Sequence, residues 1–260
     1  MGSTAPEQDE ITVLVTGFAP FKPEYPINPS WEIARTLPSY LPPSSSSSLP
    51  PIRLLVHPAP IHVSYSTVRA LVPQLWSRKI DYAIHIGMAG PRLFYSIERR
   101  GHRDGYAMKD VDGQFLNDQE RRIKEGENWI WAGLPTELET DLVLDDVLVR
   151  WKGYCGADKD LRISEDAGRY LCDFIYYSSL AELYKRGRER NVVFFHVPCE
   201  NSERNFEIGR GLLVELIRAV VESGEKAKGE KVKGVDGAKG VVKGTENIKP
   251  VEAVGVNGTA

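Results

Sequence analysis

The segment Ile163-Ser-Glu-Asp-Ala-Gly-Arg-Tyr-Leu-Cys-Asp-Phe-Ile-Tyr-Tyr177 joins a short strand pattern to a long amphipathic helix pattern. The strand pattern covers residues 161–164 and the helix pattern covers residues 169–186. A second apolar run, Asn-Val-Val-Phe-Phe at residues 191–195, is typical of a buried strand. A strand, a helix and a strand in this order predict a parallel sheet, because parallel neighbours need a crossover connection.

The same alternation of strands and helices extends toward both ends of the chain. Parallel strands carry helices on both faces of their sheet and read as nearly continuous apolar runs. We therefore predict an α/β fold, a three-layer α/β/α sandwich with a mainly parallel central sheet. Residues 98–131 are polar and are expected to form extended segments and long loops. The other predicted strands are residues 11–15, 52–56 and 82–86. The other predicted helices are residues 29–37, with Asn28 as N-cap, 65–78, 142–151 and 206–221.

A cysteine and a histidine occupy positions that favour nucleophilic chemistry. Cys172 lies in the first turn of the helix predicted for residues 169–186, where unpaired N–H groups and the helix dipole favour a thiolate. His196 follows the apolar strand 191–195, and functional groups of open α/β sheets gather at the carboxyl ends of strands. The two residues are a candidate nucleophile and base. The alternative interpretation of Cys172 is a small buried residue at a helix start.

Spacing alone does not choose the carboxylate that would orient the imidazole. Glu98 is one candidate, with a surface salt bridge to a neighbouring arginine as its alternative role. Glu165 and Asp166 lie closer to the cysteine in sequence, although Asp166 is also suited to cap the helix. His102, four residues after Glu98, competes for the role of base. The remaining thiols and imidazoles are expected to be bystanders, namely Cys155, Cys199, His57, His62 and His85.

Composition describes an ordinary globular chain. Of its 260 residues 42% are hydrophobic and the formal net charge is −3, which indicates neither nucleic acid nor an anionic membrane surface as a partner. No apolar run approaches the roughly 20 residues of a membrane helix, and the first residues lack the apolar core of a signal peptide. Three cysteines without paired spacing predict reduced thiols, a cytoplasmic location and no zinc site.

Three segments differ in composition from the rest. Residues 1–10 are polar and predicted to be flexible, and residues 38–51, with five consecutive serines flanked by prolines, are predicted to be a flexible loop insert. Residues 224–260 contain no aromatic residue and four Lys-Gly pairs, a composition that predicts a disordered tail. The remaining residues, 11–223, are predicted to form a single domain.

Six short motifs follow one another along this domain. They are Val15-Thr-Gly-Phe-Ala-Pro-Phe21, Asn28-Pro-Ser-Trp31, His85-Ile-Gly-Met-Ala-Gly90, Glu98-Arg-Arg-Gly-His-Arg-Asp-Gly-Tyr106, Asp166-Ala-Gly-Arg-Tyr-Leu-Cys172 and Phe195-His-Val-Pro198. Together they resemble the pyroglutamyl-peptidase I family, cysteine peptidases that remove an N-terminal pyroglutamate, and they are closest to its animal-type members. The resemblance covers residues 11–221 and implies a sandwich of the phosphorylase/hydrolase kind.

The resemblance also implies roles for individual residues. It assigns Cys172 as nucleophile, His196 as base and Glu98 as the carboxylate, with no metal or cofactor and with pyroglutamyl peptides as substrates. It places Phe18, Phe21, Asn28 and Met88 around the pyroglutamyl ring, although Met88 stands where bacterial members often have glutamine. Two alternatives are a phosphorylase or nucleosidase on a similar fold, disfavoured because no phosphate-binding loop is present, and a non-catalytic binding relative. Oligomeric state stays open.

Overall fold

The computed structural model describes residues 10–43, 49–90, 92–156 and 158–239. Its contacts divide the chain into two units, Met1–Gly224 and Glu225–Ala260. The first unit contains every strand and the candidate site. In the second unit, helix α6, which begins at Glu203, continues to Lys239, and Lys228 pairs with Glu225 at 2.8 Å.

Seven strands form the central sheet of the first unit, in the order β2-β3-β1-β4-β9-β5-β8, and two more form a small antiparallel sheet, β6-β7. The central sheet is mainly parallel: only the edge strand β2 and the pairing of β5 with β9 are antiparallel. The strands are β1 Ile11–Thr16, β2 Tyr40–Leu41, β3 Ile52–Val56, β4 Tyr82–Met88, β5 Tyr95–Glu98, β6 Arg100–His102, β7 Glu137–Glu139, β8 Leu161–Ser164 and β9 Val192–Val197.

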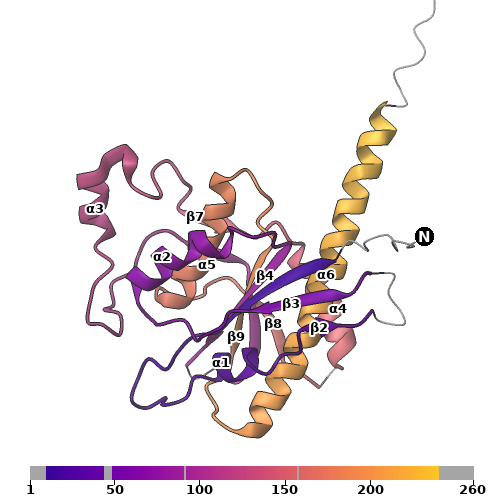
Figure 1. Cartoon of the computed structure of the whole chain (residues 1–260), viewed down its shortest axis with the longest axis horizontal. Helices are drawn as coiled ribbons and strands as arrows, with labels where there is room; N and C mark the ends of the chain where they lie inside the picture. Colours follow the sequence, from indigo (N-terminus) through magenta and orange to yellow (C-terminus); the bar gives the residue numbers. More distant parts are fainter. Residues whose placement is uncertain (1–9, 44–48, 91, 157, 240–260) are drawn as a thin grey trace, which may run out of the picture. The chain divides into compact units, whose positions relative to one another are not determined.

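Helices cover both faces of the sheet, as Figure 1 shows. One buried cluster joins the strands to α1, α4 and the first part of α6, and a second joins them to α2 and α5. The fold is therefore the predicted three-layer α/β/α sandwich. The helices are α1 Pro29–Ala34, α2 Tyr65–Leu75, α3 Asp118–Glu125, α4 Leu144–Cys155, α5 Leu171–Lys185 and α6 Glu203–Lys239, with a 3-10 turn at Gly126–Asn128.

Alternation along the strands decides which residues face which layer. In β9, Val193 and Phe195 pack toward α4 and α6, whereas Val192 and Phe194 pack toward α5. Because successive side chains of a strand point to opposite faces, His196 lies on the α5 face with Phe194. The two rings contact each other, with centroids 4.7 Å apart. The sheet therefore presents His196 to the helix that carries the candidate nucleophile.

The structure corrects several predicted boundaries. Strands β3 and β8 match their predicted limits, but β5 was missed because its four residues precede a long polar segment. That segment also contains β6 and α3. The predicted loop insert contributes edge strand β2, and helix α4 continues past its predicted end at residue 151 to Cys155.

The ends of the chain bear on two further predictions. The last helix was predicted to end at residue 221, but it continues to Lys239, since Lys, Glu and Ala are good helix formers. Residues 1–9, 44–48 and 240–260, for which flexibility or disorder is predicted, lie outside the described residues. Within the described ranges, no helix combines the length and the apolar character that a membrane crossing requires.

Candidate active site

Three neighbouring strands bring a glycine, a histidine and a carboxylate together on the α5 face of the sheet. Gly87 of β4 is the register partner of His196 in β9, and Ser96 of β5 is the partner of His196 on the other side. Glu98 lies two residues beyond Ser96, so its side chain points to the same face. Both Glu98 and His196 are buried. Contrary to the prediction, His196 lies within its strand, because β9 continues to Val197.

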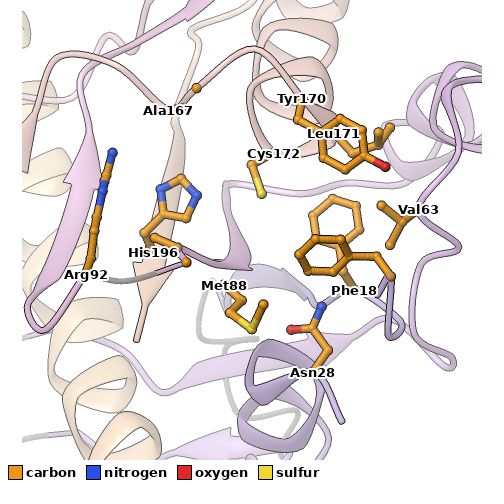
Figure 2. Close-up of a pocket in the computed structure, with 14 residues that line it drawn as sticks. Phe18, Asn28, Val63, Met88, Arg92, Ala167, Tyr170, Leu171, Cys172 and His196 are labelled. Atoms are coloured by element: carbon orange, nitrogen blue, oxygen red, sulfur yellow. The ribbon is translucent and has the colours of Figure 1, made fainter. Parts of the chain in front are cut away.

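Cys172, in the first turn of α5, faces Gly87, His196 and Glu98 from the helix layer that covers this side of the sheet. A Cβ atom built on Gly87 would lie 2.8 Å from Cys172 Sγ and 2.6 Å from the Phe194 ring. The sulfur therefore lies over the backbone of β4, next to the register partner of His196. Figure 2 shows Cys172 and His196 facing the same pocket. Only glycine at residue 87 leaves room for the thiol at this position.

Replacing Gly87 by alanine is expected to displace the sulfur or the Phe194 ring. Overpacking of this kind costs about 1–3 kcal/mol of stability, and misplacing a nucleophile by about 1 Å reduces turnover on the order of a hundredfold. Gly209→Ala is the matched control, since its Cβ would clash with Ile33, which belongs to the core cluster on the opposite face of the sheet from α5. The melting temperature and the turnover of both variants are measured. Both should lose stability, but only Gly87→Ala should also lose turnover. Equal effects of both variants on turnover would contradict the role given to Gly87.

A short hydrogen bond couples His196 to Glu98. The distance from His196 Nδ1 to Glu98 Oε1 is 2.7 Å. Burial by itself raises the pKa of Glu98, but the hydrogen bond and charge of His196, together with the Ser164 hydroxyl and the Arg92 cation, outweigh burial and hold the pKa below its usual value. An ionised carboxylate only accepts hydrogen bonds, so His196 Nδ1 carries the proton. His196 Nε2 is then left as the basic nitrogen.

The protonation state of Cys172 differs from the thiolate that was predicted from its position at a helix start. Burial raises the pKa of Cys172 to about 12, and the negative charges of Glu98 and Asp173 act in the same direction. Desolvation thus outweighs the helix dipole, and the thiol is neutral at rest. The thiol can therefore react only if a base accepts its proton during the attack. His196 is suited to this role, because its Nε2 carries no proton.

The thiol and the imidazole open into a pocket of about 340 Å³. All four residues expected around the substrate ring line it, namely Phe18, Phe21, Asn28 and Met88. In Figure 2, Phe18, Val63, Tyr170 and Leu171 lie on one side of Cys172, whereas His196 and Arg92 lie on the other. The pocket therefore has an apolar end and a polar end, with the sulfur between them.

Asn28 both caps a helix and holds the loop that forms the aromatic wall of the pocket. Its Oδ1 accepts hydrogen bonds from Ser30 N at 3.1 Å and Ser30 Oγ at 2.9 Å, so it caps helix α1. Its Nδ2 donates to the Ala19 carbonyl at 2.9 Å, which holds the loop that follows β1. Ser30 Oγ in turn accepts from Phe18 N at 3.0 Å. This network fixes the aromatic wall of the pocket.

The rival candidates have other partners. His102 Nδ1 lies 3.1 Å from Asp173 Oδ1, in a buried cluster with Tyr106. Glu165 pairs with two surface arginines, and Asp166 accepts bonds from Gly168 N and Arg169 rather than capping the helix directly. His85 bonds Thr16 and Ser179 in the core, where burial lowers its pKa to about 3, as expected of a bystander.

Sequence reasoning missed several residues of the pocket. Arg92 and Tyr170 line it, and neither carried a motif-based role. Tyr170 was visible as the residue two before the cysteine, and it packs against Phe21 with ring centroids 6.2 Å apart. Arg92 gave no comparable signal, because its side-chain partners Ser96 and Glu98 lie on a strand that the sequence did not predict. Val63, Ala167 and Leu171 complete the apolar lining.

The fold and the site describe a cysteine peptidase on an open α/β sheet. Solved structures share this fold: a mutant pyrrolidone carboxyl peptidase from Pyrococcus furiosus has a TM-score of 0.63 at 23% identity, over 82% of this chain and 99% of the other. Pyroglutamyl peptidase I from Bacillus amyloliquefaciens has a TM-score of 0.60 at 22% identity, over 82% and 96%.

Within that class, the chain belongs to the pyroglutamyl peptidase family, whose family model matches residues 11–222. It is 34% identical to pyroglutamyl-peptidase 1 of Rattus norvegicus over 224 residues, which are 84% of this chain and 95% of the relative. It is 33% identical to pyroglutamyl-peptidase 1 of Homo sapiens, over 83% of this chain and 90% of the relative. The resemblance inferred from the motifs is confirmed.

Proposed function

We propose that this protein hydrolyses the bond that follows an N-terminal pyroglutamyl residue of peptides, through Cys172, His196 and Glu98. The observation that carries the proposal is the pocket in which a thiol separates an apolar end from a buried imidazole–carboxylate pair. The pyroglutamyl ring occupies the apolar end beside Phe18 and Met88. The leaving peptide then extends past His196.

The reaction follows from this arrangement. Cys172 Sγ attacks the pyroglutamyl carbonyl carbon while its proton passes to His196 Nε2, and Glu98 stabilises the imidazolium that forms. His196 returns that proton to the amine as the C–N bond breaks. Water then attacks the thioester with His196 as base, which releases pyroglutamate and restores the thiol. The proton of the thiol leaves on the amine, and the proton that His196 takes from water passes to the sulfur, so the cycle is balanced.

The start of α5 supplies the group that stabilises the tetrahedral intermediate. No described side chain caps this helix, and the Asp173 carboxylate is turned away to His102 and Tyr106. The backbone N–H groups of the first turn are therefore available to the oxyanion, whose charge is also favoured by the helix dipole. We assign the oxyanion hole to these N–H groups.

The pocket suits an uncharged ring better than an amino terminus. None of its described lining residues is acidic, so a protonated prolyl or glutamyl amine would lose water without gaining a counter-ion. The lactam of pyroglutamate has no such charge. The same lining argues against a phosphorylase, since its one guanidinium, Arg92, is already bonded to Glu98. The three free cysteines support a location in the cytoplasm.

Release of a fluorescent amine from pyroglutamyl, prolyl and glutamyl conjugates tests this function. The value of kcat/KM for the pyroglutamyl conjugate is expected to exceed the other two by at least about a hundredfold, the scale on which unpaired buried charges are rejected. Comparable rates for the prolyl conjugate would show that the pocket does not select the lactam. No release from any conjugate would refute the peptidase assignment for this chain.

A further inference from the structure

Arg92 bonds both the Glu98 carboxylate and the loop that precedes the helix of Cys172. It lies in the connection between β4 and β5 and lines the pocket beside His196. Its Nη1 donates to Glu98 Oε1 at 3.1 Å and to Ser96 Oγ at 3.2 Å, and its Nη2 donates to the Asp166 carbonyl at 3.1 Å. Asp166 belongs to the loop that leads into the helix of Cys172. One guanidinium therefore ties the carboxylate to the segment before the nucleophile.

All described bonds to the Glu98 carboxylate converge on one oxygen. Oε1 accepts from His196 at 2.7 Å, from Arg92 at 3.1 Å and from Ser96 at 3.2 Å. The other oxygen, Oε2, is buried and has no hydrogen-bond partner among the described residues. The hydroxyl of Ser164, the register partner of Glu98 on β8, donates to the Asp166 carbonyl at 3.3 Å and also helps to hold the pKa of Glu98 low. The buried charge of Glu98 thus depends on the three donors at Oε1 and on the nearby Ser164 hydroxyl.

We infer that Arg92 is a positioning residue, which keeps Glu98 ionised and aimed at His196 so that the imidazole keeps its basic nitrogen toward the thiol. Arg92 has no part in bond making. The inference goes beyond the proposed function, in which only Cys172, His196 and Glu98 have roles, and it rests on that function for its kinetic test.

The charges around Glu98 determine the direction in which loss of Arg92 shifts the pKa of Glu98. His196 faces it from β9, Cys172 and Tyr176 face it from α5, and Arg92 is the one permanent cation that bonds it among the described residues. Tyr176 donates to the Glu98 backbone carbonyl and leaves the carboxylate untouched. Removing the cation disfavours the carboxylate and raises the pKa of Glu98. The acidic limb of any activity that needs this carboxylate must then move to higher pH.

Arg92→Met and Arg92→Lys test the inference with two readouts. The first is kcat for the pyroglutamyl conjugate, which should fall about tenfold in Arg92→Met, the value of one hydrogen bond to a charged group, with KM changed by less than about twofold. The second is the rate at which iodoacetamide alkylates Cys172, followed by peptide mapping across a range of pH. In both readouts the acidic limb should move to higher pH for Arg92→Met and return toward the wild-type position for Arg92→Lys.

Arg162→Met is the matched control. Arg162 and Arg92 both lie over the Phe94 ring, 4.1 and 5.8 Å from its centroid, but Arg162 pairs with exposed Asp160 and does not line the pocket. This variant should keep the wild-type pH profile. If Arg92→Met also kept it, or if it only raised KM or lowered the melting temperature, the inference would be overturned. Alkylation of Cys172 needs no peptide substrate, so this arm decides the role of Arg92 even if the proposed function fails.

Discussion

Replacing Cys172 by serine is expected to lower turnover of the pyroglutamyl conjugate by at least about a thousandfold, the scale seen when the nucleophile of a catalytic unit is removed. Burial and the charges of Glu98 and Asp173 already make the thiol harder to ionise than usual. A serine hydroxyl in the same place has a higher intrinsic pKa, so a base set to accept a thiol proton activates it poorly. The smaller oxygen also fits the space above Gly87, and the fold should be retained.

The measurement is kcat/KM of Cys172→Ser beside that of Cys155→Ser, with circular dichroism to verify folding. Cys155 ends helix α4 on the opposite face of the sheet and lies outside the pocket, so its variant should stay close to wild type. Substantial turnover in Cys172→Ser, or a large loss in Cys155→Ser alone, would place the nucleophile elsewhere.

The losses of turnover caused by His196→Ala and Glu98→Gln are expected to be non-additive, because the two residues act together. The first removes proton transfer and should cost at least about a thousandfold in kcat. The second keeps the size of the side chain but loses the charge that fixes the tautomer and stabilises imidazolium, so a loss of about 10- to 1000-fold is expected. Because Glu98 acts through His196, the double variant should be no worse than about tenfold below His196→Ala.

His102→Ala separates this unit from the neighbouring imidazole. His102 bonds Asp173 behind the nucleophile helix, and it does not line the pocket. Its removal should lower the melting temperature, because Asp173 stays buried with fewer donors, while kcat falls less than about tenfold. Losses for His196→Ala and Glu98→Gln that simply multiply in the double variant would argue against a coupled pair. A greater loss of kcat in His102→Ala than in His196→Ala would transfer the role of base to His102.

Local pattern was enough for the parts of the site that lie on regular elements. The helix with Cys172 in its first turn and the strand next to His196 were predicted from apolar periodicity, whereas the aromatic residues after β1 were expected at the pocket only from the family resemblance. The four residues expected around the substrate ring line the pocket. Periodicity predicts such helices and strands because apolar residues recur at the spacing of the face that is buried.

The choice among the carboxylates was beyond such patterns. Glu165 and Asp166 are near the cysteine in sequence, yet Glu98 reaches His196 because β5 pairs antiparallel to β9 across the sheet. The ionisation of Cys172 was also misjudged, since a helix start indicates its dipole but not the burial that outweighs it.

By itself, the sequence determined the α/β/α architecture, the order of the motifs and the side chains able to carry out the chemistry. Only the tertiary structure decided which of them meet, which oxygen of Glu98 holds the imidazole, and how Arg92 joins the two halves of the site. The reason is physical: strand and helix patterns depend on neighbours within a few residues. Strand pairing, desolvation and the meeting of charges depend on groups that the fold brings together from distant parts of the chain.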